Sequence, residues 1–263
     1  EEVNGAPFYV MAFVDGTVLD SPEKGELLPQ HLRAGASEHL VDVLADLHAV
    51  DIDAVGLGDL AKREGYVERQ VKRWSTQWEN SKTRELPAIE EVSRLLSRDI
   101  PVQQGVSIAH GDYRFGNVLT DVANGRVAAV LDWELSTLGH PLADFSYHCM
   151  AWHIPHHLGR GMAGLSPTPA GIPTESQYVL RYAQRTGVTD LSSLQKDWNF
   201  YLAYNLFRLA AILQGIAKRV VDGTASSAEA KAAGQGARGV GPQPGVGRVL
   251  SLRSAPRRRA GDR

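Results

Sequence analysis

The chain has 263 residues, of which 43% are hydrophobic and 22% are charged, as is ordinary for a soluble globular protein. The formal net charge is −2, yet residues 234–263 carry seven arginines against one aspartate, so the rest of the chain is acidic. An acidic body argues against nucleic acid as a partner.

We expect no transmembrane segment, no signal peptide and no disulfide. No run approaches 18 consecutive apolar residues, and the chain opens on two glutamates rather than on a basic segment followed by an apolar one. The single cysteine, Cys149, cannot form an intrachain disulfide. A reducing, cytoplasmic setting with Cys149 in the core is therefore expected. The oligomeric state cannot be inferred from these features.

The first hundred residues are expected to form one strand and three helices. Residues 8–14 are apolar and read as a buried strand that ends at Asp15-Gly16. Ser37 could cap the first helix, on which leucines recur at helical spacing. The three helices are expected over about 37–50, 66–80 and 87–97.

The pattern changes after residue 100. Short apolar runs at 107–109, 118–120 and 127–131 read as strands, and Asn124-Gly125 between the last two is a strong hairpin turn signal. Beyond residue 222 the apolar periodicity is lost, so we expect a disordered, low-complexity basic tail over 223–263. Between these parts, helices are expected over about 143–153, 175–186 and 194–221, with a Gly/Pro-rich loop at 159–173.

Three polar side chains are predicted to meet at one end of the hairpin. Asp112 and Asn117 share the loop before its first strand, and Asp132 follows its second strand. Because a tight hairpin returns the chain, Asn117 and Asp132 become neighbours. Two carboxylates and an amide oxygen suit Mg²⁺, which binds few carboxylates together with phosphate oxygens. Phosphoryl transfer needs such a metal, and a carboxylate to receive the proton of the attacking hydroxyl.

Within this set Asp112 is the candidate base, and Asn117 and Asp132 are the candidate metal ligands. Arg114 lies two residues after Asp112, where an extended loop points its side chain to the same side, so its guanidinium could hold the transferring phosphoryl group. Each residue also has a structural explanation, as a turn residue, an Asx turn, a helix cap or a surface salt bridge. For His110 the structural role is preferred, in which it braces the loop by hydrogen bonds.

This pattern resembles the aminoglycoside phosphotransferase and choline kinase superfamily, which is related to the protein kinases. The better match within it is the group similar to the kinase-like N-terminal domain of acyl-CoA dehydrogenase family members 10 and 11. The resemblance covers about residues 1–222 and implies an α+β, protein-kinase-like fold. Its mostly helical C-terminal lobe would carry a catalytic β-hairpin. The segments that carry the resemblance are 8–16, 44–48, 108–117 and 130–144.

The resemblance implies a role for each residue of the loop and the hairpin. Asp112 matches the catalytic aspartate, and Asn117 and Asp132 match the magnesium ligands. Arg114 occupies the place of a phosphate-contacting lysine of protein kinases. Asp144 matches an acidic residue that holds the catalytic loop by its backbone amides.

The resemblance also implies an ATP site at the start of the chain. Met11 to Val14 match the hinge, where main-chain groups of Ala12 and Val14 would contact adenine. In the family an N-terminal lobe with a phosphate-covering loop, a strand lysine and a helix glutamate precedes the hinge. We therefore expect residues 1–16 to be the hinge strand and a remnant of that lobe, and residues 17–222 to form the C-terminal lobe. Such a fragment would have weak activity or none.

The expected function is transfer of the γ-phosphoryl group of ATP, with Mg²⁺, to the hydroxyl of a small molecule. The better family match implies a hydroxyacyl-CoA or a related hydroxy acid as acceptor, and an aminoglycoside or amino alcohol is the alternative. A second hypothesis is a non-catalytic, pseudokinase-like binding module. A third is a metal-dependent hydrolase that uses Asp112 and the histidines between residues 140 and 157, whose spacing matches no zinc signature.

Overall fold

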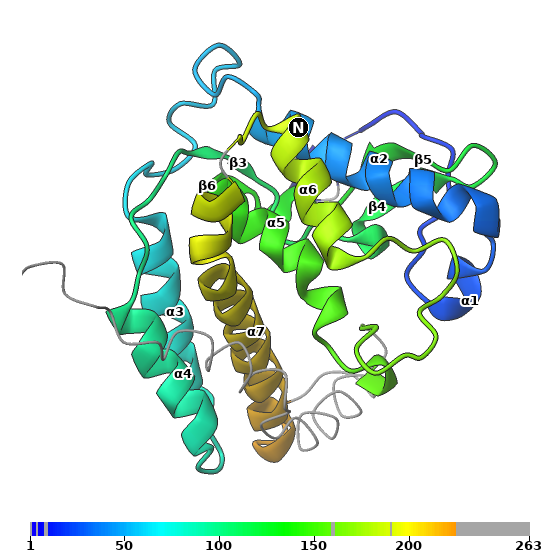
Figure 1. Ribbon diagram of the computed structural model, residues 1–263. Helices are drawn as coiled ribbons and strands as arrows, with labels where there is room; N and C mark the ends of the chain where they lie inside the picture. The colour runs from blue at the N-terminus through cyan, green and yellow to red at the C-terminus, as the bar shows by residue number, and fades with distance from the viewer. Residues whose placement is uncertain (1, 4, 8–9, 159–160, 190, 225–263) are drawn as a thin grey trace, which may run out of the picture.

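The computed structural model describes all residues except 1, 4, 8–9, 159–160, 190 and 225–263 (Figure 1). The described part is an α+β structure with three two-stranded sheets, paired as β1-β2, β3-β6 and β4-β5. Most of the tail expected at 223–263 lies outside the described residues.

The elements follow one another along the chain in this way. The strands are β1 (Glu2–Val3), β2 (Ala6–Pro7), β3 (Ser107–Ala109), β4 (Val118–Asp121), β5 (Arg126–Val130) and β6 (Thr137–Gly139). The α-helices are α1 (Pro22–Gly25), α2 (Gln30–His48), α3 (Tyr66–Ser81), α4 (Pro87–Arg98), α5 (Pro141–Cys149), α6 (Glu175–Arg185) and α7 (Leu191–Val221). Short 3-10 turns lie at Phe115–Asn117, Trp133–Leu135, Met150–Trp152 and His156–Leu158.

The strand expected over residues 8–14 is wrong for its described part. Residues 10–14 have no strand partner and are exposed, with 93% of Phe13 accessible to solvent. The segment joins the described body at Thr17, whose backbone forms an isolated antiparallel bridge with Thr120 of β4. An apolar run becomes a buried strand only where a neighbouring strand and a covering layer are available.

The helix boundaries differ from expectation mainly at α2. This helix begins at Gln30, seven residues before the expected cap, because Pro29 precedes the first turn and Ser37 is buried inside the helix. At α5 the helix ends at Cys149, and the chain continues to Trp152 as a 3-10 turn rather than as α-helix. Helices α3 and α4 begin at the expected residues and extend one residue further.

The expected hairpin is formed by β4 and β5. Val118 pairs with Val130 and Asp121 pairs with Arg126, so the strands are antiparallel along their whole length. Gly125 in the connecting turn has a φ of 64°, a left-handed conformation that glycine adopts without strain. The two ends of the hairpin are therefore separated: the turn lies at one, and the loop before β4 meets the segment after β5 at the other.

A second antiparallel pair of strands determines where these two segments meet. Strands β3 and β6 pair with Ile108 opposite Leu138. Residues 110–117 therefore leave β3 and enter β4, while residues 131–136 leave β5 and enter β6. Because both connections run between the same two strand pairs, the two loops lie side by side.

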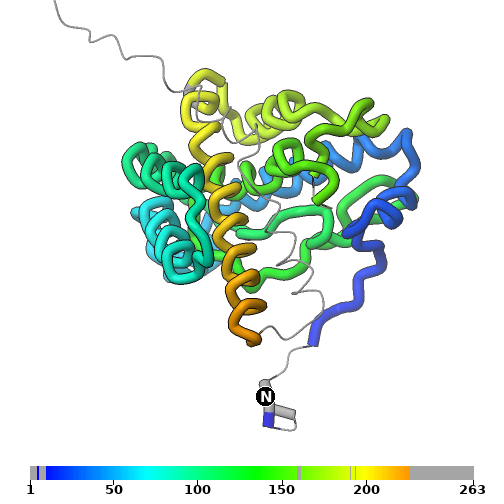
Figure 2. Tube along the Cα trace, turned by 90° about the horizontal axis from the view of Figure 1, so that it is seen from below, coloured from blue at the N-terminus to red at the C-terminus, as the bar shows by residue number. Residues whose placement is uncertain are grey.

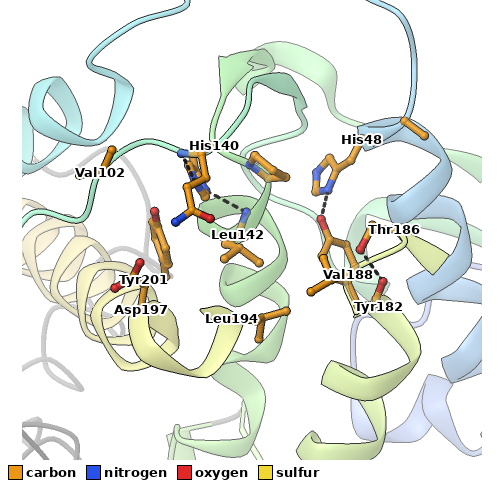
Figure 3. A pocket seen from close by; sticks show the side chains of 13 residues that line it. His48, Val102, His140, Leu142, Tyr182, Thr186, Val188, Leu194, Asp197 and Tyr201 are labelled. Atoms are coloured by element: carbon orange, nitrogen blue, oxygen red, sulfur yellow. Dashed lines mark hydrogen bonds between the residues drawn. The ribbon is translucent and has the colours of Figure 1, made fainter. Parts of the chain in front are cut away.

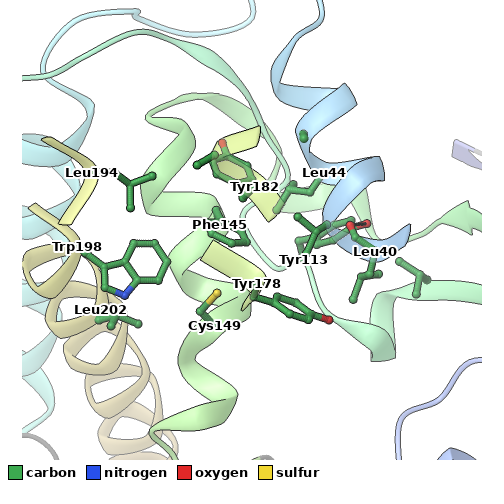
Figure 4. Packing of buried hydrophobic residues seen from close by; sticks show 14 residues of the cluster. Leu40, Leu44, Tyr113, Phe145, Cys149, Tyr178, Tyr182, Leu194, Trp198 and Leu202 are labelled. Carbon is green, nitrogen blue, oxygen red and sulfur yellow. Dashed lines mark hydrogen bonds between the residues drawn. The ribbon is translucent and has the colours of Figure 1, made fainter. Parts of the chain in front are cut away.

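Two hydrophobic clusters hold the helices, and α7 contributes to both. Figure 4 shows the first, built from α2, α5, α6 and the start of α7, where the rings of Phe145 and Tyr182 stack at 4.0 Å. The second joins α3 and α4 to the middle of α7, which runs beside them in Figures 1 and 2. Trp198 and Leu202 of α7 belong to the first cluster, and Tyr204 and Phe207 belong to the second.

Helix α7 is also, in the described part of the chain, the one helix long and apolar enough to cross a membrane, over Leu194–Val221. Its apolar stretch is 61% buried inside the protein. The core helix of a globular protein has the same length and composition, and the packing of α7 in both clusters accounts for them here.

Candidate active site

Asp144 in the first turn of α5 holds the loop that follows β3. One carboxylate oxygen accepts the backbone N–H of His110 at 2.7 Å and the other accepts that of Gly111 at 2.8 Å. The ring of His48, on α2, lies 3.2 Å from the first of these oxygens. Burial by itself would raise the pKa of Asp144, but the hydrogen bonds from His48 and the two amides hold it below its ordinary value.

Gly111 is required by the shape of this loop. Its φ is +83°, and a Cβ at this position would lie 2.8 Å from the carbonyl oxygen of Leu135 in the neighbouring loop. Its own carbonyl oxygen accepts a hydrogen bond of 2.8 Å from the guanidinium of Arg208, on α7. A larger residue would therefore push the two loops apart at this point.

His110 joins the same two loops through its side chain. Nε2 of the buried ring lies 2.8 Å from the carbonyl oxygen of Leu131, and Nδ1 lies 3.2 Å from the backbone nitrogen of Asp112. Since a carbonyl can only accept and an amide can only donate, this pattern places the ring proton on Nε2. The side chain is engaged on both sides by the backbone.

Asp112 and Asn117 contact one another directly. The side-chain amide nitrogen of Asn117 donates to the backbone oxygen of Asp112 at 2.8 Å and to its carboxylate Oδ2 at 2.7 Å. Because both hydrogens of this amide face Asp112, the Oδ1 atom of Asn117 is the one left for a cation. The side chain of Asp112 is 18% exposed, so the carboxylate lies at the surface of the loop but is partly enclosed.

Arg114 lies on the same side of the loop as Asp112. Its backbone is extended, and its Nε atom is 3.5 Å from Oδ2 of Asp112. The guanidinium passes over Gly116, where a Cβ would collide with it. The exposed fraction of the Arg114 side chain, 40%, leaves the charge accessible to a ligand.

Asp132 follows β5 at the shared end of the hairpin. The backbone N–H of Leu131 donates to the backbone oxygen of Asn117 at 2.8 Å, so Asp132 comes one residue after a direct link to Asn117. Asp132 is exposed, and its φ of 65° is the one positive value among the described residues other than glycine. An aspartate tolerates this left-handed conformation better than most residues, and such strain gathers at functional sites.

The residues expected to contact adenine are placed differently. Met11, Ala12 and Val14 lie in the exposed segment before Thr17, without secondary structure and without a described hydrogen bond to the loop that holds Asp112. The structure thus brings together Asp112, Arg114 and Asn117 by direct contacts, with Asp132 in the adjoining segment.

Two residues of this arrangement were missed in the sequence. The hydroxyl of Tyr147, on α5, donates a hydrogen bond to Oδ1 of Asp112. The guanidinium of Arg208 stacks over the ring of Tyr147 at 4.9 Å and over that of Trp74 at 5.5 Å. The available signals were the spacing of Tyr147, three residues after Asp144 on one helix face, and an arginine inside an apolar helical run.

The histidines between residues 140 and 157 do not form a common site. His140 lies between the backbone amides of Gln104 and Leu142, His153 contacts Glu175, and His156 contacts a backbone oxygen. In the ranges that the structure describes, no three side chains of histidine, cysteine, aspartate or glutamate gather as metal ligands would. The geometry gives the hydrolase hypothesis no support.

His148 is buried in an aromatic environment, and this makes stability depend on pH. Burial lowers the pKa of His148 to about 4, as it also does for His140. In the unfolded chain these two histidines bind a proton below about pH 6.5, whereas in the folded protein they do so only near pH 4. Their neutral burial therefore costs no stability above pH 6.5, and the free energy of unfolding falls as the pH drops from there toward 4.

Between pH 7 and pH 5 the wild-type protein is expected to lose about 2 kcal/mol of stability through His148, because over about 1.5 pH units of this range the unfolded histidine binds a proton and the folded one does not. In His148→Phe this part of the loss should be absent. Urea unfolding at both pH values measures it. His31→Gln, which changes an exposed histidine, should keep the wild-type pH dependence. An unchanged loss in the His148 variant would show that this histidine is not the neutral, buried group.

A cavity of about 290 Å³ lies between the ends of α2 and α6 and the starts of α5 and α7 (Figure 3). Its wall includes His48, whose Nδ1 lies 2.7 Å from the hydroxyl of Tyr182 and whose other nitrogen faces Asp144. Most of its remaining wall is apolar, from residues such as Leu142, Val188 and Leu194. Asp112 does not line it, so the cavity is separate from the loop surface described above.

Known proteins resemble this chain over most of its length. Residues 1–171 match the phosphotransferase enzyme family, APH. Acyl-CoA dehydrogenase family member 10 of Mus musculus is 38% identical over 233 residues, which cover 88% of this chain and 21% of that protein. Acyl-CoA dehydrogenase family member 11 of Homo sapiens is 32% identical over 86% of this chain and 28% of its own length. The chain thus spans between a fifth and a third of these relatives.

Solved structures show the same likeness. A putative aminoglycoside phosphotransferase from Ralstonia eutropha is 46% identical with a TM-score of 0.78, over 91% of this chain and 70% of that one. A type VIII aminoglycoside-3′-phosphotransferase has a TM-score of 0.53 at 16% identity, over 74% of this chain and 66% of that one, and shares the fold alone.

Proposed function

Since the chain belongs to the phosphotransferase enzyme family and has its kinase-like fold, we propose that it transfers the γ-phosphoryl group of ATP to the hydroxyl of a small molecule. The family and fold expected from the sequence are confirmed by these comparisons. The observation that carries the proposal is the contact of Asn117 with Asp112, together with the backbone link from Leu131, next to Asp132, to Asn117 at the same end of the β4–β5 hairpin.

The donor set at this end suits a magnesium ion. Asn117 presents an amide oxygen, because its nitrogen is bound to Asp112, and Asp132 presents an exposed carboxylate. Both are hard oxygen ligands, and an exposed position leaves room for water and phosphate oxygens in the remaining places. We assign Asn117 and Asp132 as the residues that would hold Mg²⁺, which would supply neutralisation of the phosphate charges when bound.

The other side chains supply proton transfer and charge. Asp112 is the proposed base, because its carboxylate is held in place yet remains partly exposed, within reach of an incoming hydroxyl. Arg114 is proposed to contact the transferring phosphoryl group, since its guanidinium is accessible and lies beside Asp112. Asp144 and His110 keep the loop in position by contacting its backbone.

The acceptor is proposed from the relatives. The curated relatives are named as acyl-CoA dehydrogenase family members, which favours a hydroxyacyl-CoA or a related hydroxy acid. The solved structure at 46% identity is named as a putative aminoglycoside phosphotransferase, so an aminoglycoside is the alternative. A panel of both classes, incubated with ATP, Mg²⁺ and the protein, separates them by which compound gains phosphate.

Nucleotide binding tests the metal site without knowledge of the acceptor. We expect the wild-type protein to bind ATP more tightly with Mg²⁺ than without it. Asp132→Asn should weaken the Mg²⁺-dependent binding about tenfold or more, because a carboxylate ligand is replaced by a neutral amide. Calorimetric titration with and without Mg²⁺ measures this difference.

The same hairpin offers a matched control. Asp121 is an aspartate at the opposite, turn end of the hairpin, where it accepts hydrogen bonds from the backbone of residues 123 and 124. Asp121→Asn should leave Mg²⁺-dependent binding unchanged. ATP binding that is independent of Mg²⁺, or that weakens equally in both variants, would contradict the proposed site.

A further inference from the structure

Both oxygens of the Asp112 carboxylate already carry a hydrogen-bond donor from the protein. Oδ2 accepts the amide of Asn117 at 2.7 Å, and Oδ1 accepts the hydroxyl of Tyr147. The hydroxyl of Tyr147 therefore takes one of the two lone-pair positions through which Oδ1 could receive the proton of an acceptor hydroxyl.

We propose that Tyr147 guards the base: its hydroxyl occupies Oδ1 of Asp112 while the acceptor site is empty, and it yields this place to the acceptor hydroxyl but not to water. This inference rests on the proposed function, because it concerns the same phosphoryl transfer. Tyr147 acts through Asp112 and is a positioning residue rather than a catalytic one.

The surroundings of Tyr147 keep its hydroxyl on Asp112. The guanidinium of Arg208 stacks on its ring at 4.9 Å and is itself tied to the carbonyl of Gly111 by a hydrogen bond of 2.8 Å. Arg208 also contacts the ring of Trp74 on α3. The ring of Tyr147, which belongs to α5, thus packs against Arg208 of α7, and its hydroxyl donates to Oδ1 of Asp112.

The chemistry of the phenol fits a guard. The pKa of Tyr147 is raised above its ordinary value, first by burial and second by the negative charge of Asp112. The hydroxyl therefore keeps its proton and donates it, instead of becoming a second base. A phenol that donates to an anionic oxygen makes one of the stronger hydrogen bonds available to a neutral side chain.

The reaction that such a guard suppresses is hydrolysis of ATP. In it a water oxygen forms a bond to the γ-phosphorus, the bond from that phosphorus to the leaving oxygen of ADP breaks, and the water proton passes to Asp112. Water brings only its own hydrogen bonds to displace Tyr147. An acceptor brings the binding energy of its other contacts, and this difference favours transfer over hydrolysis.

The test is ADP formation from Mg²⁺–ATP with no acceptor present. In Tyr147→Phe we expect ADP release to rise on the order of tenfold, since a hydrogen bond to a charged group no longer opposes water. The rise should vanish in the Asp112→Asn/Tyr147→Phe double variant. The Oδ1 atom freed by the loss of the phenol can take a proton from water only when residue 112 is a carboxylate. Tyr147→Leu, which also lacks the hydroxyl, should behave like Tyr147→Phe.

Tyr178→Phe is the matched control, since it removes a buried phenol hydroxyl that bonds to Ser37 and not to Asp112. Its ADP release should equal that of the wild type, and thermal unfolding should show all single variants folded. Unchanged or lower ADP release in both Tyr147 variants, with Mg²⁺-dependent ATP binding intact, would overturn the inference and leave the proposed function standing. Absence of that binding in the wild type would overturn both.

Discussion

Asp112→Asn is expected to lower phosphoryl transfer to the acceptor on the order of a thousandfold. General-base catalysis contributes between about a hundredfold and ten-thousandfold, and a neutral amide cannot take the proton of the attacking hydroxyl. The substituted amide can keep an oxygen at the place of Oδ2, where the wild-type carboxylate accepts from Asn117 and faces the guanidinium of Arg114. Its nitrogen then lies at the place of Oδ1, beside the hydroxyl of Tyr147, which can turn to accept.

The measurement is kcat/KM for the acceptor, from ADP release coupled to product formation. Binding of ATP with Mg²⁺ should change little, because Asp112 is not one of the proposed metal ligands. Asp121→Asn, at the turn end of the hairpin, should retain the wild-type rate. If Asp112→Asn kept more than about a tenth of the rate, Asp112 would not be the base and the proposed mechanism would be wrong.

Asp144→Ala is expected to lower the free energy of unfolding by about 3–5 kcal/mol, as is usual when one partner of a buried charged network is removed. Three donors would lose their acceptor at once: the backbone amides of His110 and Gly111 and the ring of His48. The side chain of Asp144 is 1% exposed, so little water is available to replace it. Urea unfolding at pH 7 gives the difference.

Asp42→Ala serves as a comparison, because Asp42 is also paired, with Arg181 at 2.6 Å, but at a position that solvent reaches. It should cost only about 1 kcal/mol. The lowered pKa of Asp144 means that its stabilising effect is present above the unfolded value of about 3.8 and lost as the pH falls through the lower folded value. The difference between wild type and Asp144→Ala should therefore persist from pH 8 to pH 5 and narrow only in stronger acid. Equal costs for the two variants would contradict the bracing role.

The hairpin and its loop could be predicted because their signals are local. Asn124-Gly125 specifies a tight turn, and once the turn is known, the positions of Asn117 and Asp132 on either side follow from strand pairing. Helices α3 and α4 were similarly accessible, since Pro87 marks the first turn of α4 and the apolar spacing of α3 is helical. In each case the deciding information lies within about 20 residues of sequence.

The rest of the fold and of the site depends on contacts between segments that are far apart in the sequence. The apolar run at 10–14 is exposed because a strand needs a partner that the run itself does not specify. Tyr147 reaches Asp112 only because β3, β6 and α5 bring residues 35 positions apart into contact. Arg208 reaches Gly111 across 97 positions. Neither contact follows from spacing, although an arginine in an apolar helix indicates that it has a buried acceptor.

The position of α7 has a consequence for how the protein unfolds. One face of this helix belongs to the cluster of α2, α5 and α6, and another belongs to the cluster of α3 and α4. Because α7 forms part of both clusters, opening one cluster disrupts the packing of the other. The two clusters therefore unfold as a single cooperative unit. Arg208 lies in the same stretch and holds the carbonyl of Gly111. The loop that carries Asp112 should therefore keep its shape for as long as α7 stays packed in both clusters.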